Sequence, residues 1–235
     1  MGSSVVYRWL RHCVDLLLPG QCMICSEPGL PARELCSACL AMLPRLPPSC
    51  PRCALPLPAD AVAGQCCEAC LASPPPLTAT VAAFVYDWPV DGLLRRFKFH
   101  QDLAAGRLLS QLMMVGCAAA EQPQLVVPIS LHRQRLRRRG YDQALELAKP
   151  IAAALQLPCR PLLQRIRLTQ PQSRLDAQQR ASNLLGAFVA LEPPPAHVVL
   201  VDDVMTTGAT LQAAAQALLA AGALRVDAWV CARVP

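Results

Sequence analysis

The chain has 235 residues, of which 54% are hydrophobic and 16% are charged, and its formal net charge is +6. This length fits one large domain or a medium domain with a small one, and the apolar fraction is enough for a real core. Every apolar run is shorter than the ~18 to 20 residues that a membrane span needs, so we expect no transmembrane helix.

The first 19 residues are expected to form an amphipathic helix. Its apolar positions fall on one helical face, and they are Val6, Trp9, Leu10, Cys13 and Leu17. Charged residues interrupt this stretch and no small-residue cleavage site follows, which argues against a secretory signal. We expect the helix to dock on its own domain, with anchoring to a surface as the alternative.

Residues 20–73 carry a repeated metal-binding pattern. Of the 13 cysteines in the chain, eight form four C-x-x-C pairs: Cys22/Cys25, Cys36/Cys39, Cys50/Cys53 and Cys67/Cys70. Each pair supplies two sulfur ligands from one tight turn, and zinc prefers four ligands in a tetrahedral arrangement. We therefore predict a double zinc ribbon with two structural zinc ions, one held by the first four cysteines and one by the last four.

Two alternatives remain open for the zinc ligands. An interleaved cross-brace would also bring four cysteines to each ion, and Cys66 could replace Cys67, although the x-x spacing favours Cys67. Thiolates at metal-binding spacing suit a reducing compartment, so we expect a cytoplasmic protein.

The composition changes near residue 75, where the run from Ser73 to Pro76 predicts a stiff linker. Residues 78–235 then alternate between strand and helix patterns and form one expected domain. The expected strands are Val81–Tyr86, Leu125–Ile129, Val198–Val201 and Val226–Cys231. The expected helices are Val90–Phe99, Leu103–Ala119, Tyr141–Leu155 and Ala209–Ala221, and Leu162–Leu191 is expected to be irregular apart from a helical stretch at Ala177–Leu185. This alternation predicts an α/β fold, a mostly parallel sheet flanked by helices.

The segment from Val198 to Leu211, VVLVDDVMTTGATL, has the features of an anion site. A buried strand ends in Asp202 and Asp203, a loop of hydroxyl residues with one glycine follows, and a helix then begins. Free N–H groups and the positive end of the helix dipole favour a phosphate there. The two carboxylates would repel a phosphate, so they suit ribose hydroxyls or a hydrated Mg²⁺ ion instead.

A basic segment follows the strand expected to end at Ile129. Five of the seven residues from Arg133 to Arg139 are arginines, and we expect them on a loop, with Arg139 and Gly140 opening the next helix. Arginine forks suit pyrophosphate or nucleic-acid phosphates, and a solvated basic loop is the alternative. Its place at the end of a parallel strand favours ligand binding.

The strand, the paired acids and the T-T-G-x-T loop resemble the phosphoribosyl pyrophosphate motif of type I phosphoribosyltransferases. The resemblance implies that Asp202 and Asp203 hold the ribose hydroxyls, with Mg²⁺ nearby. It also implies that the 5′-phosphate is cradled by Met205, Thr206, Thr207, Gly208, Ala209 and Thr210. For the leaving pyrophosphate the candidates are Lys98, Arg138 and Arg139. Arg165 and Arg167 are candidates for further phosphate ligands.

Nearly the whole chain resembles the competence protein F family, which includes GntX-type proteins. The likeness comprises the cysteine ribbons, Lys98 with Phe99, V-P-I at 127–129, R-R-G-Y-D-Q and the T-T-G motif. Tyr141 and Asp142 stand where the family usually has Phe and Asn, and Asp142 adds a negative charge beside the expected pyrophosphate site. The resemblance implies a phosphoribosyltransferase-like domain behind zinc ribbons and a role in DNA uptake during natural transformation.

Two functions are compatible with these motifs. The first is an enzyme that transfers a phosphoribosyl group to an acceptor, which needs an acceptor pocket. The second is a non-catalytic module that binds single-stranded DNA and partner proteins of the uptake machinery. Aromatic residues make up 4% of the chain, too few for extensive base stacking, so we expect DNA binding through Arg133 to Arg139 with little sequence preference.

Overall fold

The computed structural model of the chain describes residues 20–166 and 186–235, without the side chain of Arg138. The helix expected over residues 1–19 and the helical stretch expected at 177–185 lie outside the described residues. The chain divides into two compact units, one that ends at Leu43 and one that spans Pro44–Pro235. In the described part of the chain, no helix is both long enough and apolar enough to cross a membrane.

The smaller unit is organised around the first four cysteines. Short antiparallel bridges pair Gln21 with Pro28 and Leu30 with Arg33, and the short helix α2 (Ser37–Ala41) follows. The thiol of Cys36 caps this helix by accepting a hydrogen bond from the backbone N–H of Cys39. With so little apolar area to bury, a segment of this size relies on metal binding for stability.

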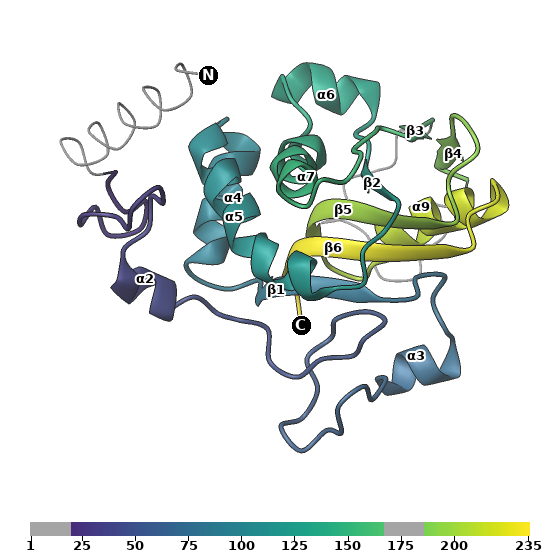
Figure 1. Cartoon of the computed structure of the whole chain (residues 1–235), viewed down its shortest axis with the longest axis horizontal. Helices are drawn as coiled ribbons and strands as arrows, with labels where there is room; N and C mark the ends of the chain where they lie inside the picture. The colour runs from purple at the N-terminus through teal and green to yellow at the C-terminus, as the bar shows by residue number, and fades with distance from the viewer. Residues whose placement is uncertain (1–19, 167–185) are drawn as a thin grey trace, which may run out of the picture. The chain divides into compact units, whose positions relative to one another are not determined.

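The larger unit is built on a four-stranded parallel sheet (Figure 1). The strands, in the spatial order β1-β6-β5-β2, are β1 (Thr80–Val85), β6 (Arg225–Arg233), β5 (His197–Met205) and β2 (Leu125–Pro128). Their sequences are almost continuously apolar, as expected of strands that are covered on both faces. The predicted mostly parallel sheet flanked by helices is confirmed.

Helices cover both faces of this sheet (Figure 1). One face packs against α5 (Leu103–Ala119) and α7 (Gln143–Ala154), and α4 (Val90–Phe99) packs on α5. The other face packs against α9 (Ala209–Ala220). Because side chains alternate along a strand, Val198 and Leu200 of β5 join the core on the α9 side. Val199, which lies between them, points to the opposite face of the sheet.

The arginine-rich segment is a helix, so the prediction of a loop was wrong. Helix α6 (Arg133–Arg139) begins after His132, whose imidazole Nδ1 accepts a hydrogen bond from Gln134 N. Arg, Leu and Gln are all good helix formers. Gly140, with φ of 81°, ends this helix in the left-handed conformation rather than opening the next one.

The segment expected to be irregular contains a small antiparallel sheet at its two ends. Strands β3 (Leu163–Arg165) and β4 (Phe188–Ala190) pair with each other, with Arg165 opposite Phe188. Phe188 is buried and joins the core on the α9 side. The pairing of the two strands fixes the backbone at Arg165, and the sequence pattern did not predict this pairing.

Candidate functional site

Each unit holds one group of four cysteines. The sulfur atoms of Cys22, Cys25, Cys36 and Cys39 all lie within 4.8 Å of one another, and the same is true of Cys50, Cys53, Cys67 and Cys70. The distances Cys25 Sγ–Cys36 Sγ and Cys53 Sγ–Cys67 Sγ are both 3.6 Å. Four sulfurs at ~2.3 Å from a tetrahedral zinc ion would be about 3.8 Å apart. Both groups therefore fit zinc, in the sequential arrangement and with Cys67 rather than Cys66 as a ligand.

The surroundings of the sulfurs favour thiolates bound to a cation. Burial alone would raise the pKa of Cys50, but backbone N–H groups at Cys67, Cys53 and Arg52 outweigh it and lower the pKa to about 6. Cys22 is lowered to a pKa of about 6 in the same way. In contrast, burial and the neighbouring sulfurs raise the pKa of Cys70. Without a cation, four thiolates this close could not all ionise, and a closed set of four sulfurs is typical of structural zinc.

Asp202 and Asp203 lie at the carboxyl end of β5, in the part of the strand that still pairs with β6. The strand continues to Met205, four residues beyond its predicted end, so both acids belong to the sheet. Successive side chains of a strand point to opposite faces. Asp203 is 6% exposed, and its Oδ2 forms an ion pair of 2.7 Å with Lys98 Nζ. Asp202 instead lines a pocket with the loop that follows.

The position of Lys98 is fixed by how α4 packs on α5. The preceding residue, Phe97, is completely buried, and its ring occupies the place where a Cβ at Gly106 would lie, 2.4 Å from Phe97 Cε2. Burial would lower the pKa of Lys98, but the adjacent Asp203 carboxylate and then Asp202 more than offset this and raise the pKa. Lys98 is therefore a cation held over the two acids.

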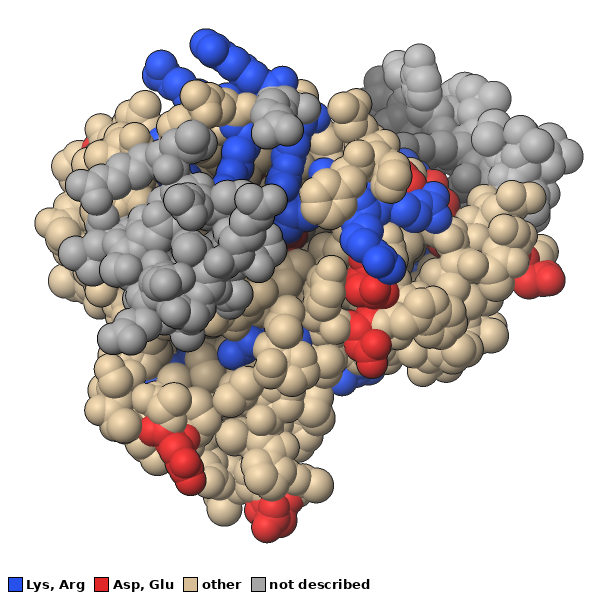
Figure 2. Space-filling view, turned by 180° about the vertical axis from the view of Figure 1, so that it is seen from behind, with Lys and Arg blue, Asp and Glu red and all other residues tan. Residues whose placement is uncertain are grey.

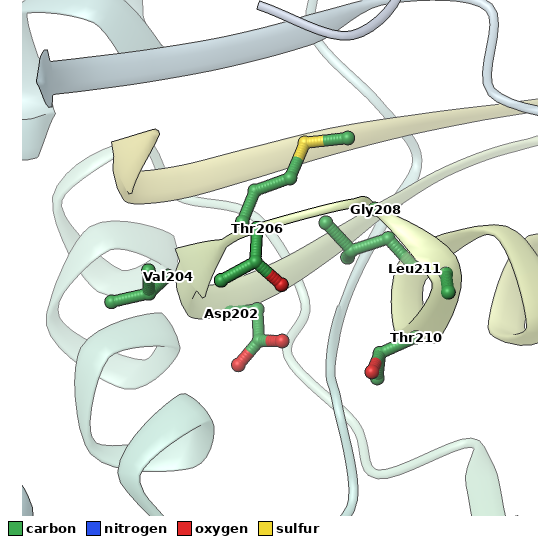
Figure 3. A pocket seen from close by; sticks show the side chains of 8 residues that line it. Asp202, Val204, Thr206, Gly208, Thr210 and Leu211 are labelled. Carbon is green, nitrogen blue, oxygen red and sulfur yellow. The ribbon is translucent and has the colours of Figure 1, made fainter. Parts of the chain in front are cut away.

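The loop after Asp203 forms the other side of the pocket. Figure 3 shows Asp202, Thr206 and Thr210 lining one hollow between the end of β5 and the start of α9. Gly208 has φ of 79°, and a Cβ there would lie 2.5 Å from Met205 Cε, so this turn requires glycine. The N–H groups at the start of α9 and the threonine hydroxyls are donors that can bind an anion, although Ala209 N donates to the Thr207 hydroxyl oxygen at 3.4 Å in the ligand-free protein. Thr207, in contrast, is exposed.

The arginines of α6 divide between two faces of the helix. Arg135 and Arg139 are half-buried, whereas Arg133 and Arg137 are exposed. The Arg139 guanidinium donates to the Gln143 side-chain oxygen (2.7 Å) and lies 5.8 Å from the centre of the Phe99 ring. The positive charge of Arg139 is close enough to Lys98 to act on its pKa, in the lowering direction. Arg139, which was predicted as a site residue, therefore lies near Lys98 at the site. The side chain of Arg138, also predicted, is outside the described residues.

Two further cations approach from other elements. Arg165 of β3 is 7% exposed and lies 5.4 Å above the centre of the Phe188 ring. Burial and then the charge of Arg135 lower the pKa of Arg165 to about 10, while Asp202 acts in the opposite direction. Arg135 and Arg165 therefore belong to the same electrostatic cluster as Asp202. The basic segment included Arg135, and Arg165 was also among the predicted phosphate ligands, but no local pattern indicated the pairing of β3 with β4 that positions Arg165. The predicted ligand Arg167 lies outside the described residues.

Asp142 has a structural part in the site. Its Oδ1 accepts a hydrogen bond from Leu145 N (3.1 Å) as the cap of α7, and its Oδ2 accepts one from Leu131 N (3.2 Å). Asn caps helices as well as Asp does, so it could keep the bond from Leu145 N, but its amide nitrogen could not accept the bond from Leu131 N. Nearby, the hydroxyl oxygen of Ser130 is buried without a hydrogen-bond partner among the described residues. It stands just after the carboxyl end of β2.

Asp202 is poised between its neutral and its ionised form near neutral pH. Burial, followed by the repulsion of Asp203, raises the pKa of Asp202 to about 7, and Lys98 only partly compensates. Four cations (Lys98, Arg135, Arg139 and Arg165) thus surround two carboxylates. This excess of positive charge suits a ligand with several negative charges, and the carboxylates suit hydroxyl groups or a metal ion on the same ligand.

Comparison with known proteins agrees with both parts of this description. Residues 13–79 match the double zinc ribbon domain family, and residues 142–235 match the phosphoribosyl transferase domain family. DNA utilization protein YhgH of Salmonella typhimurium is 34% identical over 227 residues, which cover 93% of this chain and 99% of that protein. Competence protein F of Haemophilus influenzae is 32% identical over 210 residues, covering 85% of this chain and 90% of that protein. The two cysteine clusters are therefore structural zinc sites, and the loop after Asp203 lies in a phosphoribosyl transferase domain.

Proposed function

Because the chain belongs to the family of competence protein F and DNA utilization protein YhgH, we propose that it binds phosphoribosyl pyrophosphate together with Mg²⁺ at the carboxyl end of β5. We assign residues 20–73 to the double zinc ribbon, residues 78–235 to the phosphoribosyltransferase-like domain and residues 1–19 to an N-terminal helix. We place the protein in the cytoplasm, where its eight zinc-binding thiolates stay reduced.

One observation carries this proposal: two carboxylates lie between a phosphate-type loop and a cluster of four cations. In the proposed complex the 5′-phosphate occupies the loop from Met205 to Thr210, where N–H and hydroxyl groups converge. Asp202 and Asp203 face the ribose hydroxyls and the hydrated Mg²⁺ ion. Arg135, Arg139 and Arg165 face the pyrophosphate, which arginine forks bind with two hydrogen bonds at once.

This arrangement supports transfer of the phosphoribosyl group to an acceptor. In such a reaction the bond between ribose C1 and pyrophosphate breaks, and C1 forms a bond to a nucleophile of the acceptor. The departing pyrophosphate takes the bonding electrons, and the surrounding cations stabilise the charge that develops on it. Lys98 pairs with Asp203 at 2.7 Å and holds this carboxylate in place for the ribose.

Calorimetric titration with phosphoribosyl pyrophosphate tests the proposal. We expect saturable binding that needs Mg²⁺, because the metal neutralises part of the ligand's charge beside two carboxylates. A second assay measures pyrophosphate released in the presence of a panel of nucleobases and amines. Release that depends on one acceptor would identify the protein as an enzyme, whereas binding without release would identify a ligand-binding module. If the wild-type protein does not bind the ligand with Mg²⁺ present, the proposal is wrong.

A second candidate function, binding of single-stranded DNA, is favoured by the outer face of α6. Arg133 and Arg137 are exposed there, one helical turn apart. Figure 2 shows basic side chains projecting into solvent at the upper edge of the molecule, where Figure 1 places α6. A row of phosphates could bind this face while the pocket stays open, with uptake proteins as further partners.

Replacing Arg133 and Arg137 with Ala should weaken binding of single-stranded DNA and reduce its dependence on salt. Each phosphate contact contributes ~0.7 to the slope of log affinity against log salt concentration, so the double variant should lose about 1.4 from that slope. Fluorescence anisotropy with a labelled oligonucleotide at several salt concentrations measures it. Arg107→Ala, a charge change on α5, is the control. An unchanged slope in the α6 variant would exclude this face as the DNA-binding surface.

A further inference from the structure

The second cysteine cluster (Cys50, Cys53, Cys67 and Cys70) is part of the same compact unit as the sheet. Its backbone is hydrogen-bonded to the edge strand β1. Thr80 N donates to Pro51 O (2.8 Å), and the Thr80 hydroxyl donates to Arg52 O (2.7 Å). Both acceptors lie in the C-x-x-C turn of this cluster, so the zinc-binding turn is fastened to the sheet.

One buried side chain links this turn to the end of β5. Arg233, near the end of β6, is 7% exposed. Its Nε donates to Cys53 O (2.9 Å), and its Nη1 is within 3.4 Å of Met205 O. The neighbouring Val234 N donates to Met205 O as well (3.0 Å). Arg233 therefore donates to the backbone carbonyls of a zinc ligand, Cys53, and of the first residue of the phosphate loop, Met205.

Met205 also packs against the glycine of the loop, Gly208. Its side chain is 2% exposed, and its Cε lies 2.5 Å from the place that a Cβ would occupy at Gly208. The side chain of Met205 thus packs directly against the turn at Gly208. If Met205 O moved, the N–H groups of the loop would lose the arrangement in which they converge on one anion.

We propose that Arg233 is a positioning residue through which the second zinc site, and not the first, holds the phosphate loop in its binding conformation. This inference rests on the proposed function, because it presumes that the loop binds the phosphate of phosphoribosyl pyrophosphate. Loss of the metal from the Cys50 cluster would free the Cys53 turn, and Arg233 would then lose its hydrogen bond to Cys53 O.

The two clusters offer a matched pair of variants. Cys39 and Cys70 are each the last ligand of their cluster, both are buried, and they lie in the similar helices SACLA and EACLA. Cys70→Ser and Cys39→Ser should each lower the zinc content by about one ion per chain. Arg233→Met keeps the length of the side chain but removes its hydrogen bonds, and it should retain both ions.

The test is the affinity for phosphoribosyl pyrophosphate with Mg²⁺, measured by calorimetry on the full chain. We expect Cys70→Ser and Arg233→Met each to weaken binding roughly tenfold, and Cys39→Ser to leave it within about twofold. Because both changes break one linkage, the double variant should bind no more weakly than the weaker single variant. Melting curves and zinc content are recorded for every variant, and Arg233→Lys replaces Arg233→Met if the latter does not fold.

Three outcomes would overturn the inference while leaving the proposed function intact. These are wild-type affinity in folded Arg233 variants, equal losses in Cys39→Ser and Cys70→Ser, and additive losses in the double variant. Absence of binding by the wild-type protein would instead reject the proposed function itself. A purely structural role of Arg233 would lower the melting temperature without this non-additive effect on affinity.

Discussion

Replacing Asp202 and Asp203 together with Asn is expected to weaken the binding of phosphoribosyl pyrophosphate by on the order of 100-fold. Each carboxylate would lose a charged hydrogen bond to the ribose or its favourable interaction with Mg²⁺, and such a hydrogen bond contributes about 1.5 to 3 kcal/mol. That corresponds to tenfold or more for each residue. Asn keeps the size and part of the hydrogen bonding, so the change isolates the charge.

The effect on folding should differ between the two acids. Asp203 is buried and paired with Lys98 at 2.7 Å, so Asp203→Asn leaves Lys98 without that partner charge and should lower the melting temperature. Asp202 has its pKa raised by burial and by Asp203, so removing its charge should stabilise the ligand-free protein at neutral pH. Melting curves of both single variants separate these opposite effects.

Asp142→Asn is the matched control for this experiment. Asp142 is a third carboxylate close enough to influence Asp202, but its role is to cap α7, and Asn keeps this cap while losing the hydrogen bond from Leu131 N. We expect affinity to be unchanged or slightly stronger, because one negative charge near an anionic ligand disappears. Calorimetric titration of all variants gives the comparison. A folded Asp202/Asp203 double variant with wild-type affinity would remove these carboxylates from the site.

Local patterns predicted most of the fold. Helices α4 and α5 begin and end where the sequence periodicity placed them, at Val90–Phe99 and Leu103–Ala119. Strand β5 is longer than predicted because polar residues after Val201 look like a loop, although they pair with β6 up to Met205. The strands β3 and β4 have three residues each. Such short strands form only through contact with each other and with the core, so no local pattern indicates them.

The residues of the candidate site also fall into two groups, those that local sequence indicates and those that packing brings together. The acids and the loop from Thr206 to Thr210 are contiguous, and the chemistry of their residue types indicates their role. Lys98, Arg135 and Arg165 come from three separate elements, and packing brings them together. The burial of Phe97 against Gly106 places Lys98, and the pairing of β3 with β4 places Arg165. Lys98 and Arg165 were candidates at the level of the sequence, but these contacts join residues distant in the chain, so spacing within the sequence could not show how packing brings them together.

Affinity for phosphoribosyl pyrophosphate is expected to fall as the pH drops below 7, by up to about tenfold per pH unit from Asp202 alone. Burial, then the charge of Asp203, raises the pKa of Asp202 to about 7 in the free protein. Ribose hydroxyls and Mg²⁺ favour the ionised carboxylate, so binding must expel a proton wherever Asp202 is protonated. Above pH 7 Asp202 is already ionised, and its contribution becomes constant.

The same shift fixes the sign of the effect on stability. Because the folded protein binds this proton more tightly than the unfolded chain, Asp202 contributes stability at low pH that is lost as pH rises through about 7. The ligand-free protein should therefore lose this contribution between about pH 4 and 7, the range in which its affinity for the ligand increases. Ionisation of Asp202 therefore lowers the stability of the ligand-free protein and raises its affinity for the ligand.

The variant Asp202→Asn distinguishes the titration of this carboxylate from the titration of the ligand, because the 5′-phosphate of the ligand itself titrates near pH 6. Calorimetry between about pH 5.5 and 8.5, in buffers of different ionisation enthalpy, counts the protons released on binding. The wild-type protein should release more protons than the variant below pH 7, and the same number above about pH 8. Proton release that is identical for the two proteins at every pH would show that Asp202 does not become ionised on binding, and would separate its role from that of Asp203.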